Sequence, residues 1–352
     1  MHATCDTIGE LAKTVLAGRS LAFEQGLLLA EADGERLYDL FHWANRIRLH
    51  FVGPAVHACG IVAGKTGSCE QDCKFCSQSA HYRTHASGRT VLGADAIVEA
   101  ARQASADGAS CFGLVNSGFG PTDEEIDLFA EAVQRVCRET RVVLCASLGV
   151  LNESQARRLY DLGVRKYNHN LQTSRRFFPN ICSTHTYDER VDTVRLCKRV
   201  GMKTCCGGLF GMGETWQDRV ELAMELRDLA VDIVPVNFLI PIPGTPLTDQ
   251  AGLTALECLK ILALYRFLLP DRIIHVCGGR EVHLRDLQSW MFYAGANGLL
   301  IGNYLTTRGR SAREDLQMLH DLGIPLAGAA AAPDDARALH EQVARYVPAA
   351  RT

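Results

Sequence analysis

Beyond residue 50, short apolar runs alternate with longer segments in which apolar residues recur at helical spacing. The short runs predict buried strands, and the longer segments predict amphipathic helices. The predicted strands cover residues 57–63, 109–115, 141–147, 165–171, 202–208, 232–239, 272–278 and 297–302. The predicted helices cover residues 94–107, 123–139, 153–162, 187–200, 215–230, 254–268, 282–294 and 312–322. Eight strand–helix alternations predict an α/β fold of the (β/α)8 TIM-type barrel class.

Two segments lie outside this alternation. Residues 1–50 have apolar residues at helical spacing and predict an N-terminal helical extension. Residues 326–352 are alanine-rich, then amphipathic, and predict a short C-terminal helical tail. Residues 51–325 are therefore the predicted barrel domain. A doubly wound open sheet is the alternative, but the G-x-G-x-x-G loop typical of that fold does not follow the first strand.

Charge and composition exclude several classes of function. The 352 residues include 37 Lys and Arg against 40 Asp and Glu, so no basic surplus favours nucleic acid. No apolar stretch reaches the roughly 18 residues of a membrane-spanning helix, and the first residues do not resemble a secretory signal. We therefore expect a cytoplasmic protein that binds neither nucleic acid nor membrane. In a reducing compartment, its 14 cysteines indicate metal or redox chemistry rather than disulfides.

Three cysteines follow the first predicted strand with the spacing C-x3-C-x2-C: Cys69, Cys73 and Cys76. Three thiolates that converge on a [4Fe–4S] cluster leave one iron without a protein ligand, and that iron can bind a small molecule. A zinc knuckle with His81 or His85 as fourth ligand is an alternative, although structural zinc sites usually take two ligand pairs. A ferredoxin-like carrier would need a fourth cysteine in the same run.

This cysteine motif after the first strand of a barrel resembles that of the radical S-adenosylmethionine superfamily. Further segments resemble the biotin synthase family in particular, and they occur in that family's order. These segments are 65–82, 167–174 (YNHNLQTS), 186–190 (TYDER), 206–215 (CGGLFGMGET), 234–237, 243–247 (PGTPL), 279–281 and 294–297 (AGAN). The resemblance covers about residues 50–325.

The resemblance implies a radical sulfurtransferase that inserts sulfur into dethiobiotin to form biotin. The [4Fe–4S] cluster would cleave S-adenosylmethionine to a 5′-deoxyadenosyl radical, and an auxiliary iron–sulfur cluster would donate the sulfur. An electron donor such as flavodoxin or ferredoxin and a homodimeric assembly are also implied. The alternatives are another radical enzyme on the same barrel, such as a hydrogenase maturase, and a non-enzymatic iron–sulfur or zinc scaffold protein.

The resemblance also assigns roles to individual residues. The ligands of the [4Fe–4S] cluster become Cys69, Cys73 and Cys76. The ligands of the auxiliary cluster become Cys111, Cys145, Cys205 and Arg280. The contacts to S-adenosylmethionine become Phe75, Asn170, Gln172, Arg190, Leu209 and Ile240. The contacts to dethiobiotin become Asn168, Asn237 and Lys65.

Several positions depart from the family pattern. Gln172 replaces the usual Asp, and a neutral amide accepts a hydrogen bond without supplying negative charge. Cys206 and Cys277 are additional cysteines, so the auxiliary cluster is either [2Fe–2S] or a larger, cysteine-rich cluster.

Alternation along a strand predicts which side chains share a face. Only one of Cys205 and Cys206 is expected to face the barrel lumen. Asn168, Asn170 and Gln172 are expected on one face, and His169 on the other. Cys59 is expected in the core. Five cysteines away from the strand ends are given no chemistry: Cys5, Cys137, Cys182, Cys197 and Cys258.

Overall fold

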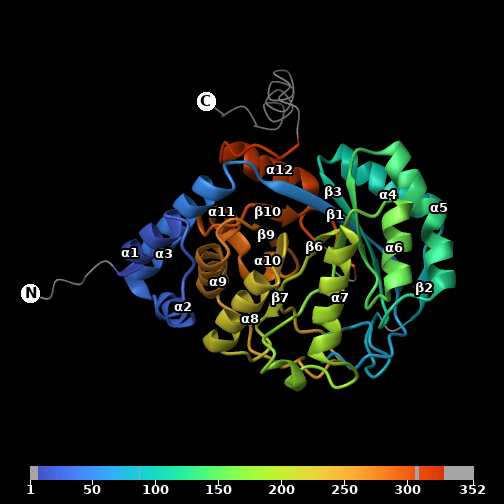
Figure 1. The fold of residues 1–352 in the computed structure, drawn as a ribbon, viewed down its shortest axis with the longest axis horizontal. Helices are drawn as coiled ribbons and strands as arrows, with labels where there is room; N and C mark the ends of the chain where they lie inside the picture. The colour runs from blue at the N-terminus through green and yellow to red at the C-terminus, as the bar shows by residue number, and fades with distance from the viewer. Residues whose placement is uncertain (1–6, 87, 306–308, 329–352) are drawn as a thin grey trace, which may run out of the picture.

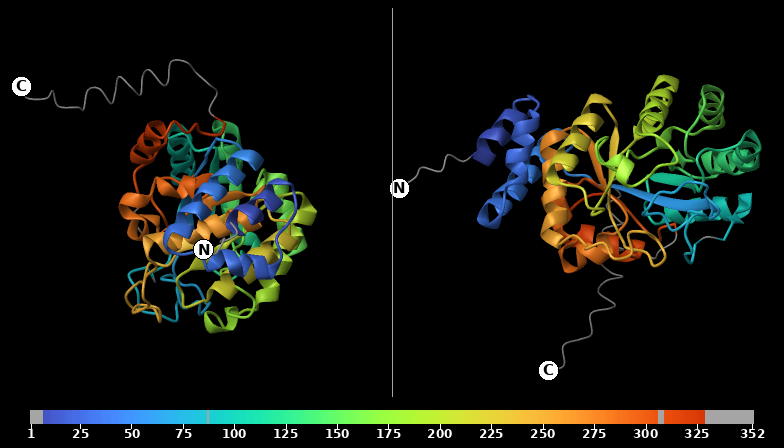
Figure 2. Two further views of the ribbon diagram at one scale, coloured as in Figure 1. Left: turned by 90° about the vertical axis from the view of Figure 1, so that its left-hand side faces the viewer. Right: turned by 90° about the horizontal axis from the view of Figure 1, so that it is seen from below.

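A closed barrel of parallel strands, surrounded by helices, forms the centre of the molecule (Figures 1 and 2). The computed structural model describes residues 7–86, 88–305 and 309–328, so the predicted tail from residue 329 onward lies outside the described residues. The strand order is β1, β3, β4, β5, β6, β8, β9 and β10, and β10 returns to pair with β1 in parallel. The predicted (β/α)8 barrel is confirmed.

The strands of the barrel are short and parallel, apart from the two-residue β2, which pairs antiparallel with the end of β1. Their bounds are β1 His57–Thr66, β2 Thr90–Val91, β3 Cys111–Asn116, β4 Val143–Ser147, β5 Lys166–Asn168, β6 Lys203–Cys205, β7 Gly208–Phe210, β8 Ile233–Phe238, β9 Ile273–Val276 and β10 Gly298–Leu300. Because the strands are parallel, their carboxyl ends meet at one rim of the barrel, where the predicted site residues lie.

All the long helices that cover the barrel except α4 begin with side-chain caps, which satisfy free N–H groups of the first turn. Examples are Thr186 and Thr254, each of which exchanges hydrogen bonds with a glutamate three residues later. The helix bounds are α4 Ala94–Ala106, α5 Asp123–Glu139, α6 Glu153–Leu162, α7 Tyr187–Val200, α8 Trp216–Asp228, α9 Ala255–Leu268 and α12 Ala312–Asp321. No helix in the described part of the chain is long and apolar enough to cross a membrane.

The predicted N-terminal extension is helical. It consists of α1 (Thr7–Leu16), α2 (Phe23–Ala30) and α3 (Gly34–Phe51), which lie on one side of the barrel against α8 and α9 (Figure 1). The apolar face of α3, which includes Leu40 and Phe41, is buried there.

Two predicted elements differ in the structure. The fifth strand is interrupted after Cys205, because Gly207 lies so close to the Pro235 carbonyl that a Cβ would come within 1.9 Å of its oxygen. The single helix predicted over 282–294 is wrong. That segment contains α10 (Arg280–His283), a 3-10 turn (Arg285–Leu287) and α11 (Trp290–Tyr293). Arg285 adopts φ +48°, which a continuous right-handed helix does not allow.

Candidate active site

A cavity of about 360 Å³ extends from the carboxyl rim into the barrel, a size typical of small-molecule sites. Two groups of thiols line it. Cys69, Cys73 and Cys76 come from the loop after β1, and the second group comes from the strands: Cys59, Cys145, Cys205 and Cys277. None of the cysteines in the described residues forms a disulfide. This agrees with the metal or redox chemistry predicted from composition.

The loop after β1 is held by its own backbone and by its neighbours. The Cys69 amide donates to the Gln78 carbonyl at 3.1 Å, and the Cys69 carbonyl accepts from the Ala80 amide at 2.7 Å. Gly244 lies so close to Arg83 that a Cβ would come within 2.0 Å of the Arg83 carbonyl oxygen. The glycine of the PGTPL segment therefore allows the loop to pack onto the region after β8.

Asp72 anchors the same loop to the segment before α7. Its carboxylate accepts from the Ser183 amide at 2.9 Å and from the Thr184 hydroxyl at 3.0 Å. Burial alone would raise the pKa of Asp72, but these donors outweigh it and hold the pKa well below its usual range. Asp72 is thus a fixed anion beside the loop cysteines.

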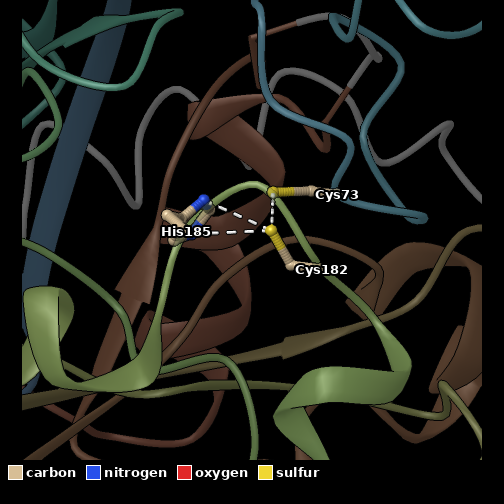
Figure 3. Close-up of side chains that lie close together, drawn as sticks. All are labelled: Cys73, Cys182 and His185. Atoms are coloured by element: carbon tan, nitrogen blue, oxygen red, sulfur yellow. Dashed lines mark hydrogen bonds between the residues drawn. The ribbon is translucent and has the colours of Figure 1, made fainter.

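The three loop thiols fit a cluster better than a single ion. A single metal ion needs three ligand atoms close together, from histidine nitrogens, cysteine sulfurs or carboxylate oxygens. Among the described residues, only Cys73, Cys182 and His185 bring three of these atoms within 4.8 Å of one another (Figure 3). Cys69, Cys73 and Cys76 therefore do not converge on one point, although all three line one cavity. The proposed zinc-knuckle ligand His81 instead bonds the Glu70 carbonyl oxygen through Nε2 at 3.0 Å. This donor set fits the [4Fe–4S] cluster expected from the spacing.

The residues expected to contact S-adenosylmethionine surround the loop cysteines. Asn170 and Gln172 line the main cavity together with Phe75. The same three side chains also line an adjoining cavity of about 260 Å³. Leu209 and Ile240 complete the apolar wall of that second cavity. The structure thus places the expected aromatic, amide and aliphatic contacts side by side.

Arg190 projects from α7 into the main cavity. Its Nε donates to His185 Nε2 at 2.9 Å, and its Nη1 donates to the Asn170 carbonyl at 2.8 Å. The guanidinium also lies 5.5 Å from the centre of the Phe178 ring. These contacts hold a cation at the position from which a carboxylate of a ligand can be bound.

Gln172 occupies an unusual backbone conformation with φ +72°. Its amide donates to the Gly207 carbonyl, and its carbonyl accepts from the Leu209 amide. Asp and Asn tolerate this region better than a longer side chain does. The substitution of the family's usual Asp by Gln therefore changes both the charge and the local backbone preference.

Hydrogen bonds hold both asparagines that are expected at the substrate, and Asn168 accepts one from Ser147 Oγ at 3.3 Å. Asn168 donates to Cys205 Sγ at 3.3 Å and lies within the main cavity. Asn237 donates to the Gly208 carbonyl at 3.2 Å and accepts from the Gly278 amide at 3.1 Å. The Asn237 side chain thus joins three neighbouring segments while lining the cavity. His169, expected on the opposite face, also lines the cavity, because β5 ends at Asn168 and the alternation stops there.

Lys65, predicted to bind substrate, forms an ion pair in the structure, and its role in substrate binding stays a prediction. Lys65 Nζ forms an ion pair with Glu125 Oε1 at 2.6 Å, and both side chains are mostly buried. Lys65 is not among the residues that line the cavity. Its charge is neutralised by the first turn of α5, so it is a structural link between β1 and α5.

The strand cysteines gather deep in the barrel. Cys59 and Cys111 are direct neighbours in the register of β1 and β3, and Cys145 on β4 pairs with Gly113. The Cys111 thiol is hydrogen-bonded to the thiols of Cys145 and Cys59. Donation by Cys145 and then Cys59 lowers the pKa of Cys111. Burial raises the pKa of Cys205 to about 12. The donor set of Cys111, Cys145 and Cys205 fits an auxiliary cluster, and Cys59, expected in the core, joins it.

Arg280 contacts α12 rather than this group of thiols in the structure, and its assignment as a cluster ligand stays a prediction. The side chain is fully buried, and its Nη2 lies 2.5 Å from Asp315 Oδ2 on α12. Its Nη1 donates to Gln288, and neither contact faces the cavity. Burial alone would lower the pKa of Arg280, but the Asp315 carboxylate outweighs burial and raises the pKa above its usual value.

His275 and Cys277, rather than Arg280, line the lumen at the end of β9. Both line the cavity, and Cys277 Sγ lies 3.5 Å from His275 Nδ1. Burial lowers the pKa of His275 to about 4, so the imidazole is neutral and has a lone pair. The two residues are two positions apart at the end of β9, and the alternation rule applied to 272–278 would have found His275 from Cys277.

Lys166 is a second residue that the sequence analysis missed. Burial alone would lower the pKa of Lys166, but the neighbouring sulfurs of Cys111, Cys59 and Cys145 raise it. Lys166 is therefore a cation beside the strand thiols. It lies two residues before Asn168, so the same alternation that grouped Asn168 with Asn170 also indicated Lys166.

Cys206 faces away from the strand thiols. It is fully buried in the apolar core and does not line the cavity, whereas Cys205 does. Only Cys205 of the two faces the lumen in the structure, as alternation predicts, and a role for Cys206 as an additional ligand stays a prediction.

Two motif residues turn out to support the site rather than line it. The buried Glu214 carboxylate accepts from the Gly211 and Met212 amides and from Arg219 Nε at 2.8 Å. Asn297 Oδ1 accepts from Arg266 and from the Ile274 amide, each at 2.8 Å. Glu214 thus fixes the loop that follows β7, and Asn297 ties the segment before β10 to the start of β9.

The fold and the cysteine loop define a radical S-adenosylmethionine enzyme. The sequence matches the Radical SAM superfamily model over residues 65–226 and the Biotin and Thiamin Synthesis associated domain over residues 235–325. It is 48% identical over 323 residues to the biotin synthase of Geotalea uraniireducens, covering 92% of this chain and 98% of that one. It is 50% identical to the biotin synthase of Heliobacterium modesticaldum, covering 88% and 95% of the two chains. The chain belongs to the biotin synthase family.

Solved structures of other radical enzymes share the fold. Methylornithine synthase superposes with a TM-score of 0.79 at 22% identity, covering 94% of this chain and 99% of that one. The FeFe-hydrogenase maturase of Carboxydothermus hydrogenoformans superposes with a TM-score of 0.79 at 18% identity, covering 92% and 80%. These likenesses concern the barrel alone, whereas the near-complete sequence matches are to biotin synthases. The protein is an enzyme that converts dethiobiotin to biotin with S-adenosylmethionine, a [4Fe–4S] cluster and an auxiliary iron–sulfur cluster.

Proposed function

We propose that both parts of the reaction take place in the one main cavity, with the loop thiols at its rim and the strand thiols in its depth. The observation that supports this most directly is that the loop thiols share one cavity of about 360 Å³ with Cys59, Cys145, Cys205 and Cys277, while Cys111 lies beside Cys59 in the register of β1 and β3. Cys69, Cys73 and Cys76 would hold the [4Fe–4S] cluster, and Cys111, Cys145 and Cys205 would hold the auxiliary cluster. When bound, the two clusters supply electron transfer to S-adenosylmethionine and sulfur for the product.

The protein's own contribution is to bind and orient. Arg190 would bind the carboxylate of S-adenosylmethionine, while Phe75, Leu209 and Ile240 enclose its adenine. Asn170 and Gln172 would bind its polar groups. Asn168 donates to Cys205 Sγ, so we assign it a place between dethiobiotin and the auxiliary cluster. The mostly apolar walls keep water away from reactive species during the reaction.

Cys59 and Cys277 support an auxiliary cluster with more cysteine ligands than three. Cys59 is hydrogen-bonded to Cys111, and Cys277 lies beside His275 in the same cavity. We therefore propose that the fourth ligand comes from Cys59, His275 or Cys277 rather than from Arg280. Lys166 supplies positive charge that compensates the thiolates.

Anaerobic Mössbauer spectroscopy with iron and sulfide analysis tests the arrangement on the reconstituted enzyme. We expect two distinct clusters, one of which changes when S-adenosylmethionine is added and one of which is consumed as biotin forms. A single cluster that supports biotin formation at the full rate would contradict the proposed division of the cavity.

We propose that residues 51–325 form the catalytic barrel that carries both clusters, with residues 1–50 as a helical extension. The buried contacts of α3 with α9 support an extension that stabilises the barrel from outside. A chain starting at residue 52 should keep cluster binding but unfold at a lower temperature. Loss of both clusters in a folded truncated chain would contradict this division.

We propose that the electron donor is a small acidic carrier such as flavodoxin or ferredoxin. Lys74, Arg83 and Arg89 are exposed beside the cysteine loop and give this surface positive charge. The charge reversal Lys74→Glu should slow reduction by flavodoxin about 10-fold at low salt, because steering by charge depends on ionic strength. Reduction by dithionite is the matched control and should not change. Equal slowing with both reductants would point to damage to the loop itself.

We propose that the chain forms a homodimer through an aromatic surface made of Tyr38, Trp290 and Tyr293. The Tyr38 ring lies 6.2 Å from the Trp290 ring, and the three side chains are between 40% and 54% exposed. Exposed aromatic groups of this kind mark association surfaces. Sedimentation velocity should show a dimer for the wild type and a monomer for Trp290→Glu. An unchanged dimer in that variant would exclude this surface.

A further inference from the structure

Cys182 and His185 form a second thiol and imidazole pair beside one of the loop cysteines. Cys73 Sγ lies 3.8 Å from Cys182 Sγ, and Cys182 Sγ lies 3.2 Å and 3.8 Å from the two ring nitrogens of His185 (Figure 3). All three residues are buried. The sequence analysis gave Cys182 no chemistry, because it follows neither a strand nor a recognised spacing.

These separations match a tetrahedral zinc ion. With Zn–S near 2.3 Å and Zn–N near 2.0 Å, tetrahedral angles place two sulfurs about 3.8 Å apart and a sulfur and a nitrogen about 3.6 Å apart. We propose that Cys73, Cys182 and His185 bind one Zn²⁺ ion in the chain that does not yet carry its [4Fe–4S] cluster. Thiolate and imidazole ligands favour Zn²⁺ over Fe²⁺, so zinc is the expected occupant.

The hydrogen bonds of His185 indicate which of its two ring nitrogens would bind the zinc ion. Arg190 Nε can only donate, and it lies 2.9 Å from His185 Nε2, so Nε2 has the lone pair. Nδ1 therefore has the proton and donates to Gln71 Oε1 at 2.7 Å. A ligating histidine whose other nitrogen donates to an oxygen is the common arrangement in metal sites. Zinc on Nε2 keeps the Gln71 bond and displaces Arg190.

Charge supports the same ion. Asp72 Oδ1 lies 3.2 Å from Cys182 Sγ, which places a fixed anion at the edge of the site. Two thiolates and this carboxylate offset both the Zn²⁺ charge and the nearby Arg190. Asp72 or a water molecule would complete the fourth position.

Zinc at this site and the [4Fe–4S] cluster exclude each other, because both need Cys73. This competition rests on Cys73 being a cluster ligand, whereas the zinc site itself does not. Zinc would also take the lone pair to which Arg190 donates and so disturb the position of that cation. The bound ion is therefore an inhibitor of cluster assembly.

The test uses the full-length, cluster-free chain under anaerobic conditions. Zn²⁺ is titrated against a chelating dye, and Co²⁺ is used in parallel because its thiolate absorption reports the number of sulfur ligands. The quantity compared is the single zinc equivalent that differs between variants, so zinc taken up elsewhere on the chain does not enter the comparison. Cys182→Ser and His185→Gln should each weaken that equivalent about 100-fold, since even partners of ligands contribute 10–100-fold.

Cys76→Ser and Cys197→Ser are the matched controls. Cys76 is a loop thiol outside the proposed site, and Cys197 is a buried thiol on α7. Both control variants should still bind the zinc equivalent that Cys182→Ser binds more weakly. If Cys76→Ser loses it as completely as Cys182→Ser does, zinc binds the loop cysteines alone and the proposal is wrong. If Cys182→Ser and His185→Gln bind zinc like the wild type, it is wrong as well.

Order of addition tests the competition separately. Zinc added before iron and sulfide should prevent formation of the [4Fe–4S] cluster in the wild type. Formation should resume when a chelator removes the zinc. The same zinc should not delay assembly in Cys182→Ser, whose circular dichroism confirms the fold. A zinc site that binds normally but leaves cluster assembly unaffected would refute the competition and, with it, the role of Cys73 in the cluster.

Discussion

The loop thiols and the strand thiols of the barrel are brought together in opposite ways. The loop thiols Cys69, Cys73 and Cys76 come from eight consecutive residues whose backbone folds on itself. The strand thiols Cys111, Cys145 and Cys205 are separated by 34 or more residues and are brought together by the register of the barrel. A loop site depends on local sequence, and a lumen site depends on the fold. Variants of the two groups should therefore fail differently.

The largest effect is expected from the loop. Cys76→Ala should abolish both S-adenosylmethionine cleavage and biotin formation, by at least about 10⁴-fold, because the groups of a catalytic unit do not act singly. Cleavage to 5′-deoxyadenosine, measured by chromatography, checks this. The auxiliary cluster should remain visible in the Mössbauer spectrum. Its loss from a folded variant would show that the two groups are not independent.

A strand thiol should separate the two activities. Cys145→Ala should lower biotin formation at least about 100-fold while S-adenosylmethionine cleavage stays within a few-fold of the wild type. The reason is that Cys145 lies in the lumen, away from the loop that would hold the first cluster. Parallel assays of 5′-deoxyadenosine and biotin on one sample make the comparison. Equal loss of both products would contradict the division of labour between the groups.

This contrast explains how much could be read from the sequence. The barrel and the loop site were predictable, because hydrophobic alternation and the spacing of Cys69, Cys73 and Cys76 are local signals. Cys59 was expected in the core, because its pairing with Cys111 depends on the register of β1 and β3, which is not a local signal. Lys166 and His275 were also missed. The alternation rule would have found Lys166 and His275, but the motif match directed attention to Arg280 instead.

Cys182 shows a different limit. It follows Cys73 by 109 residues, and no strand register connects them. Their contact depends on Asp72, which fixes the loop to Ser183 and Thr184. Neither spacing nor alternation encodes such a junction between two loops, so only the three-dimensional structure reveals it.

A variant of His275 tests whether this residue is the fourth ligand of the auxiliary cluster. His275→Gln should change the spectrum of the auxiliary cluster and lower biotin formation about 10-fold, because a neutral imidazole lies beside Cys277 in the cavity. The loop cluster and S-adenosylmethionine cleavage should be unaffected. An auxiliary spectrum identical to the wild type would remove His275 from the site.

Arg280 gives the complementary result, since its role is in stability. Arg280→Gln leaves Asp315 buried without its partner and should cost about 3 kcal/mol of unfolding free energy. Chemical denaturation of the cluster-free chain measures this. Both clusters should still assemble in the folded fraction with unchanged spectra. A selective change in the auxiliary cluster would restore the assignment of Arg280 as its ligand.

The smallest effect is expected at Cys206, and its neighbour Cys205 provides the comparison. Cys205→Ala should remove the auxiliary cluster, whereas Cys206→Ala should leave both clusters and biotin formation within about twofold of the wild type. Cys206 lies in the apolar core, so its truncation should cost only about 1 kcal/mol of stability. Iron content and Mössbauer spectra of the pair check the contrast. Loss of the auxiliary cluster in both variants would mean that the strand turns in the loaded enzyme so that Cys206 reaches the lumen. The lumen site would then depend on a local rearrangement at Gly207 as well as on the register of the barrel.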